Sequence, residues 1–108
     1  MIADRPSLAA DGQDVIHLTV RILDAEGVFC PAADNRVVFE VEGEGRLIGV
    51  ENGDPIDHDS YKADNRRAFA GMCLAIVQAT RRAGEIHVRA ASDDLQAATV
   101  RLASNGLR

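Results

Sequence analysis

The side chains best suited to chemistry gather in one polar stretch near the middle of the chain. Asp54, Asp57, His58 and Asp59 lie within six residues of one another. Calcium would need several oxygen ligands from one flexible loop, but the stretch does not match the pattern of an EF-hand. Hydrogen bonding of aspartate to nearby backbone explains the same residues as turn formers. We therefore expect no metal and no cofactor here, with calcium as the lesser alternative.

Catalytic groups are the next possibility. A glycosidase needs two carboxylates that face each other across a cleft, and one domain of 108 residues offers little cleft. Glu40 and Glu42 alternate with apolar residues, which places them on a solvent-facing strand surface. His17 and His87 alternate in the same way, and His58 lies in the polar stretch. No nucleophile and base follow a recognisable order, so we expect no catalytic residue and no enzyme activity in this chain itself.

Composition disfavours several partners. The net charge is −5, and the only adjacent basic pairs are Arg66-Arg67 and Arg81-Arg82, too few for a nucleic-acid footprint. The chain has no Trp, one Tyr and three Phe, which leaves few aromatic faces for stacking sugar rings and disfavours direct sugar binding. The longest apolar run, residues 69–77, is too short to cross a membrane.

Two cysteines, Cys30 and Cys73, leave two alternatives open. They are free and mostly buried thiols, or they form a disulfide in an exported protein. No Cys-x-x-Cys occurs, so a structural zinc site is disfavoured.

The elements that must position all these residues show an alternation of apolar and polar residues with period two. This pattern predicts half-buried strands, separated by turn signals rich in Gly, Asp and Asn. The expected strands are 7–9, 15–24, 36–42, 46–50, 71–80, 85–91 and 96–103. Short strands at such intervals are typical of a sandwich. The sequence therefore predicts an all-β fold, an immunoglobulin-like sandwich of about seven antiparallel strands.

Two segments are less clear. In the strongly apolar stretch 71–80 we expect Met72, Leu74 and Ile76 to face the core, and a helix over 67–80 is the competing prediction. Residues 56–67 are polar and irregular, and we expect them to form a long loop.

Several motifs resemble a known family. The most specific is Gly-x-Gly-x-x-x-Gly-Val-x-Asn-Gly-Asp-Pro over residues 43–55, followed by Arg-x-Ala-Phe-x-Gly over 66–71. Weaker ones are Ala-Asp-Gly-x-Asp before the strand that starts at Val15 and Asp-x-x-Gly after it. Together they cover nearly the whole chain, and they resemble the C-terminal Ig-like domain of bacterial glycoside hydrolase family 2 enzymes, the β-galactosidase-like group.

This resemblance implies a single domain, residues 1–108, excised from a larger glycosidase. It would be a non-catalytic accessory module that packs on or spaces the catalytic assembly, with the other domains of the parent as partners. The family's catalytic glutamates lie in a separate barrel domain, and none carries over to this chain. The resemblance also implies a periplasmic or secreted parent. The alternatives are a carbohydrate-binding module and a bacterial Ig-like adhesin repeat.

The specific motif also suggests a site. Residues 52–55 should form a tight turn with Gly53 at positive φ, and the loop after it should return to the sandwich. Two alternatives remain: Arg66 or Arg67 pairs with Asp54 or Glu51 and holds the loop ends together, or the loop docks on a neighbouring domain. The candidate docking residues are Asn52, Gly53, Asp54, Pro55, Asp57, His58, Arg66 and Arg67.

Overall fold

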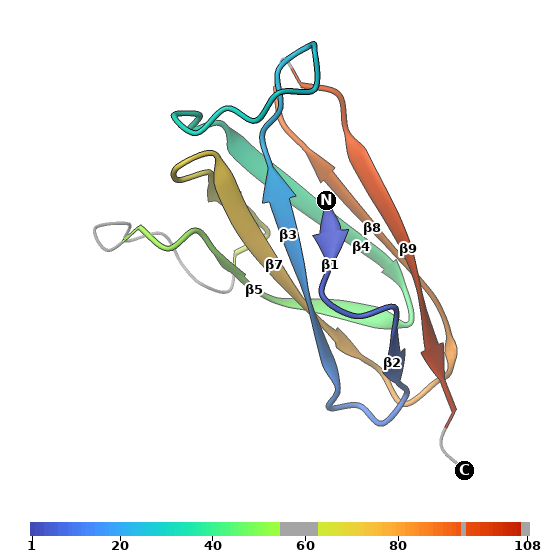
Figure 1. The fold of residues 1–108 in the computed structure, drawn as a ribbon. Helices are drawn as coiled ribbons and strands as arrows, with labels where there is room; N and C mark the ends of the chain where they lie inside the picture. Colours follow the sequence, from blue (N-terminus) through green and yellow to red (C-terminus); the bar gives the residue numbers. More distant parts are fainter. Residues whose placement is uncertain (55–62, 94, 107–108) are drawn as a thin grey trace.

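Two β-sheets stack face to face in the computed structural model, which describes residues 1–54, 63–93 and 95–106 (Figure 1). The strands are β1 (Ile2–Ala3), β2 (Ser7–Ala9), β3 (Val15–Arg21), β4 (Arg36–Gly43), β5 (Gly45–Glu51), β6 (Asn65–Arg67), β7 (Met72–Ala79), β8 (Gly84–Ala91) and β9 (Ala98–Asn105). The predicted all-β sandwich is confirmed. The described residues form nine strands rather than about seven, because the two short strands β1 and β6 carry too few residues to show an alternation.

The first sheet has the order β1-β3-β7-β5 and the second the order β2-β9-β8-β4-β6. All pairs are antiparallel, as predicted, except β2 and β9 at one edge, which run parallel. The chain changes sheets between β1 and β2 at residues 4–6. Pro6 lies in this crossover, where its missing N–H costs no ladder hydrogen bond.

The core lies between the sheets, as the alternation predicts for most strands. On β3, Ile16, Leu18 and Val20 are buried, and β8 contributes Ile86 and Val88 in the same way. The largest side chains with almost no exposure are Ile16, Leu18, Ile86, Val50, Val77 and Val88. These residues are all aliphatic, and Phe39 of β4, 2% exposed, is the one buried aromatic side chain among the described residues.

Strand β7 corrects one prediction. The side chains that face the core are Cys73, Ala75, Val77 and Ala79, and not Met72, Leu74 and Ile76. Both sets are apolar, so period two alone could not choose between them. The pairing shows how this inner face packs against β3: Ala75 lies beside Leu18 and Cys73 beside Val20, while Val77 lies beside Ile16. The competing helix over 67–80 is wrong.

The predicted loop 56–67 is partly corrected as well. Its last three residues form β6, which pairs with β4 so that Arg66 lies opposite Val37. Residues 55–62 lie outside the described part of the chain.

Candidate functional site

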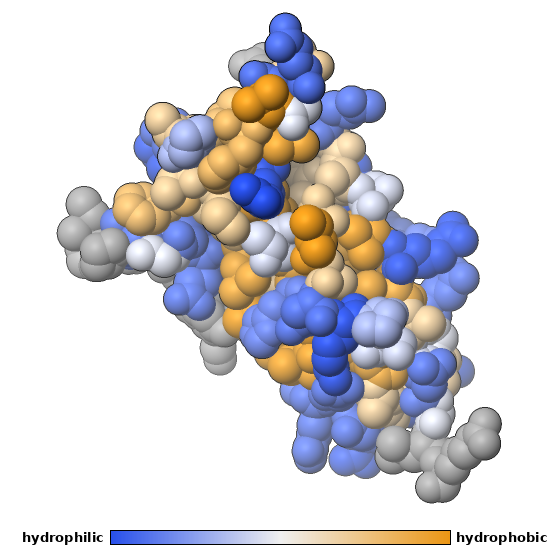
Figure 2. Space-filling model, in the orientation of Figure 1, coloured by the Kyte–Doolittle hydropathy of each residue, from blue (hydrophilic) through white to orange (hydrophobic). Residues whose placement is uncertain are grey.

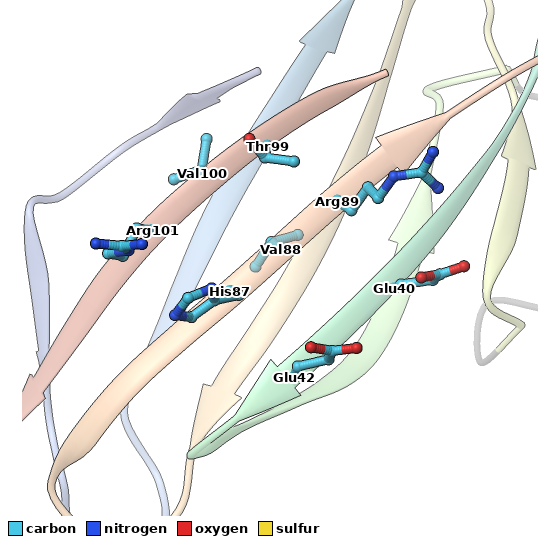
Figure 3. A pocket seen from close by; sticks show the side chains of 8 residues that line it. All are labelled: Glu40, Glu42, His87, Val88, Arg89, Thr99, Val100 and Arg101. Carbon is cyan, nitrogen blue, oxygen red and sulfur yellow. The ribbon is translucent and has the colours of Figure 1, made fainter.

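The carboxylates and histidines of the outer sheet surface do not form a catalytic arrangement. Glu40 and Glu42 lie on the same face of β4, and their cross-strand neighbours on β8 are Arg89 and His87. Figure 3 shows these side chains over the sheet, on the floor of a shallow hollow of about 280 Å³ that Thr99 and Arg101 of β9 also line. The two carboxylates share one strand rather than facing each other across a cleft, so the geometry lacks the opposed pair of a glycosidase.

His87 belongs to this polar surface and pairs with a neighbour on its own strand. Its Nε2 lies 3.0 Å from Oε2 of Glu85, and this hydrogen bond, with the charge of Arg101, lowers the pKa of the Glu85 carboxyl. Both side chains are about half exposed. Such exposed pairs contribute little to the free energy of unfolding. We therefore interpret the outer face of β4, β8 and β9 as a surface in contact with solvent.

No three His, Cys, Asp or Glu side chains of residues 1–54, 63–93 and 95–106 are grouped so that they could hold a metal ion. The same segments contain no helix long and apolar enough to cross a membrane. Of the residues considered for calcium, Asp57, His58 and Asp59 lie outside the described part.

The outer face of the four-stranded sheet has a different character. Met72, Leu74 and Ile76 of β7 point to this side, and Thr19 of β3 lies between Leu74 and Ile2 of β1. Ile2 is 64% exposed and Met72 37% exposed. Figure 2 shows apolar atoms gathered on this side of the molecule, between patches of charged ones. We call Ile2, Met72, Leu74 and Ile76 the apolar outer face. Strand β7 carries mostly apolar residues on both of its faces. This pattern is typical of a strand that other parts of a protein cover on both faces.

The two ends of the 52–66 segment are held together. The side-chain amide of Asn52 donates to the carbonyl of Arg67 at 2.8 Å, and Nη2 of Arg66 donates to the carbonyl of Val50 at 3.1 Å. Nη1 of Arg67 lies 3.7 Å from Oδ2 of Asp34. These three contacts use two backbone carbonyls and the carboxylate of Asp34, and the pairing of Arg66 or Arg67 with Asp54 or Glu51 stays a prediction.

The expected tight turn is present at its start. Gly53 has φ of +79°, and the backbone N–H of Asp54 donates to Oδ1 of Asn52 at 2.9 Å, which is the geometry of an Asx turn. Pro55, Asp57 and His58 lie outside the described residues. The docking role predicted for this loop therefore stays a prediction.

Arg66 is the residue that sequence reasoning placed least well. It is 5% exposed, and its positive charge lies near the Cys73 thiol. Burial raises the pKa of that thiol to about 12, and the charge of Arg66 opposes this rise. The residues next to Arg66 in the sequence are polar, so the pattern of residue types gave no signal that Arg66 is buried. The Arg-x-Ala-Phe-x-Gly motif was the available signal, since it makes this arginine part of a specific pattern.

Both cysteines are free thiols in this structure, with Cys73 buried and Cys30 half-buried. The sequence left open free thiols or a disulfide, and the structure has two free thiols.

The Ala-Asp-Gly-x-Asp motif forms the turn between β2 and β3. The carboxylate of Asp11 accepts from the N–H groups of Gln13 and Asp14, both at 2.8 Å. That of Asp14 accepts from Arg5 at 2.7 Å and from the N–H of Ala9 at 2.8 Å. These bonds lower the pKa of the Asp14 carboxyl. The motif therefore has a structural role, tying the N-terminal crossover to β3.

Comparison with known proteins places this fold among parts of much larger chains. Residues 1–101 match the family model described as glycoside hydrolase family 2 C-terminal domain 5. The β-galactosidase BoGH2A of Bacteroides ovatus is 39% identical over 96% of this chain, which corresponds to 12% of that protein. A β-galactosidase of Thermoanaerobacter pseudethanolicus is 37% identical over 82% of this chain and 10% of its own length.

A crystal structure of a glycosyl hydrolase family 2 member from Bacteroides cellulosilyticus has the same fold. It superposes with a TM-score of 0.92 at 30% identity, over 96% of this chain and 13% of that one. This chain thus spans about an eighth of the length of the first of these relatives and of this solved structure.

Proposed function

We propose that this chain, which belongs to the glycoside hydrolase family 2 C-terminal domain 5 family, is a non-catalytic accessory domain of a β-galactosidase-like glycosidase. Two relatives that it matches over most of its length are named β-galactosidases. In each it matches only a small part, which leaves most of the protein for other domains. The partners of this domain are then those other domains, and its role is to pack on or space the catalytic assembly.

The observation that carries this proposal is the apolar outer face. Ile76 is only 8% exposed, while Met72 and Ile2 on the same face are 37% and 64% exposed. Met72, Leu74 and Ile76 follow one another along this face of β7, and Ile2 lies across Thr19 from Leu74. Apolar side chains gathered on a surface are typical of an interaction site, and burying each Å² of them contributes about 25 cal/mol. The opposite outer face bears Glu40, Arg89 and other charged residues, so the domain has one surface suited to docking and one suited to solvent.

A pair of substitutions in the full-length protein tests this proposal. Leu74→Lys puts a charge on the apolar outer face beside Glu51, its cross-strand neighbour. Val38→Lys is the matched control, because Val38 is 40% exposed on the outer side of β4. We expect Leu74→Lys to lower the melting temperature of the parent or its kcat/KM, and Val38→Lys to leave both nearly unchanged. Equal behaviour of the two variants would contradict docking through this face.

We further propose that the parent is periplasmic or secreted, as the family resemblance implies. An antibody raised to this chain, used on fractionated source cells, would give both the compartment and the size of the native polypeptide. A band near 11.6 kDa would overturn the accessory role. A calorimetric titration with galacto-oligosaccharides tests the alternative of direct sugar binding, for which we expect no heat.

A further inference from the structure

The edge of β3 is only partly covered by β1. The two strands pair through Ile2 opposite Thr19 and Ala3 opposite Leu18. One end of β1 is closed by Asp4, whose N–H donates to the carbonyl of His17 and whose carboxylate accepts from the His17 N–H, both at 3.0 Å. The other end, at Met1, has no such closure, and the edge of β3 continues past it toward Leu23.

This uncovered edge has backbone groups in position for another strand. The N–H of Ile22 donates to the carbonyl of Gly71, and its carbonyl accepts from the N–H of Cys30, both at 2.9 Å. Because hydrogen-bonding directions alternate along a strand, the groups of Arg21 and Leu23 point to the opposite edge. Neither backbone group of Leu23 has a partner in residues 1–54, 63–93 and 95–106. Such an edge is a template for strand addition.

Next to this edge runs a groove of about 680 Å³ at one end of the sandwich. Residues 20–24 form one wall, and the ends of β8 and β9 with Ser92, Leu95 and Gln96 form the other. The lining residues used below are Met1, Val20, Ile22, Leu95 and Ala98. The groove therefore opens between the two sheets, and Met1 lies in it and packs against the core.

We propose that the polypeptide preceding Met1 in the parent protein continues β1 along Arg21–Leu23 and fills this groove. The inference rests on the proposed function, because it needs a parent chain with residues before Met1. It goes further by naming the place and the geometry of the junction between this domain and the part of the parent that precedes it.

The register identifies the occupant. Continuing the pairing of Ile2 with Thr19 puts Met1 opposite Val20 and the residue before Met1 opposite Arg21. The third residue before Met1 then lies opposite Leu23. Val20 and Ile22 face the core, so the side chain that enters the groove beside Ile22 belongs to the second residue before Met1. That residue is apolar in this proposal, because Ile22, Leu95 and Ala98 line the groove there.

A strand of the same chain suits this edge better than a separate partner does. Its first residues are already paired in β1, so the next ones extend an existing ladder at a high effective concentration. Main-chain hydrogen bonds then supply affinity, and the groove selects alternate side chains, as in other cases of strand addition.

Hydrogen exchange of the full-length protein tests the inference. The amides of Arg21 and Leu23 are compared with that of Ala25, an exposed turn residue. We expect exchange at Arg21 and Leu23 to be slower by at least about a hundredfold, as for amides in a stable ladder. Exchange at Leu23 as fast as at Ala25, with the rest of β3 protected, would overturn the added strand and leave the accessory role intact.

Slow exchange at Leu23 could come from a strand that fills the groove or from a neighbouring domain that covers this edge, and a second variant distinguishes the two. Ala98→Trp in the full-length protein blocks the groove, and Ala103→Trp, on the exposed side of β9, is the control. We expect Ala98→Trp alone to speed exchange at Leu23 and protease cleavage just before Met1. Slow exchange that persists in Ala98→Trp would overturn the groove as the binding place. A native polypeptide that starts at Met1 would overturn this inference together with the proposed function.

Discussion

Gly71 lies directly under the backbone carbonyl of Cys30. A Cβ on Gly71 would stand 2.3 Å from that oxygen and 2.8 Å from the ring of Phe29, and Gly71 has φ of +78°. Its own N–H donates to the carbonyl of Ala33 at 3.1 Å. The start of β7 is therefore packed against the β3–β4 connection at a point where no side chain fits, which explains the final glycine of the Arg-x-Ala-Phe-x-Gly motif.

Replacing this glycine should be costly. Gly71→Ala adds a methyl group against a backbone oxygen and forces alanine into the left-handed region, which alone costs roughly 1–2 kcal/mol. We expect a loss of about 3 kcal/mol or more in the free energy of unfolding, measured by urea denaturation. Gly27→Ala is the matched control, because Gly27 has φ of +81° with nothing within 4 Å of its Cβ position. Gly27→Ala should lose only the free energy that the left-handed conformation costs. Equal losses for the two variants would refute the packing explanation.

Two adjacent arginines should differ strongly in their contribution to stability. Arg66→Met keeps the buried stem but removes the hydrogen bond to the carbonyl of Val50, so we expect a loss of about 2 kcal/mol. Arg67→Met removes an exposed pair with Asp34 at 3.7 Å, for which we expect less than about 0.5 kcal/mol. Thermal or urea unfolding of the two variants gives both values. An Arg66 variant as stable as the unmodified chain would mean that this arginine does not hold β6 to β5.

The alternation of residue types predicted the fold where one face of a strand is polar. On β3 and β8 polar and apolar residues mostly alternate, and Ile16, Leu18, Ile86 and Val88 are buried as predicted. On β7 the same rule failed, because Met72 and its neighbours on both faces are apolar. This failure is consistent with the proposed function, because apolar residues on the outer side of β7 are what docking through the apolar outer face requires.

Other features depend on contacts between segments that are distant in sequence. Strand β6 forms because Asn65 and its neighbours pair with β4, and burial of Arg66 follows from that pairing rather than from local pattern. The division of the N-terminus between the two sheets likewise depends on β9, which Leu8 joins in parallel. The motif over 43–55 predicted the turn at Gly53 correctly, because positive φ is a local requirement.

Cys73 should be unreactive in the folded chain. Burial raises its pKa from 9.0 to about 12, and it is only 3% exposed. We expect a thiol reagent at pH 8 to modify one cysteine, Cys30, within minutes and the second only in urea. A Cys30→Ser variant that still reacts rapidly without denaturant would contradict this assignment.

The same thiol makes stability fall at high pH. The native state holds the proton on Cys73 between pH 9 and about 12, whereas the unfolded state releases it. The unfolded state therefore binds fewer protons, and the free energy of unfolding decreases as pH rises through this window. Urea titrations at pH 8.5 and 10.5 should show a smaller decrease for Cys73→Ala than for the unmodified chain. An equal decrease would assign the effect to other groups.

Asp14 should provide part of the stability at neutral pH and lose it in acid. The hydrogen bonds from Arg5 and from the Ala9 N–H hold its pKa below the ordinary value of 3.8. The contribution is therefore present above pH 3.8 and is lost as pH falls through the lower native pKa. Asp14→Asn should lower the free energy of unfolding by about 1 kcal/mol at pH 6, and the difference from the unmodified chain should shrink below pH 3.5. The control Glu26→Gln, at an exposed turn position, should change little at either pH. A difference for Asp14→Asn that stays constant down to pH 2.5 would show that its carboxylate charge does not hold the crossover to β3.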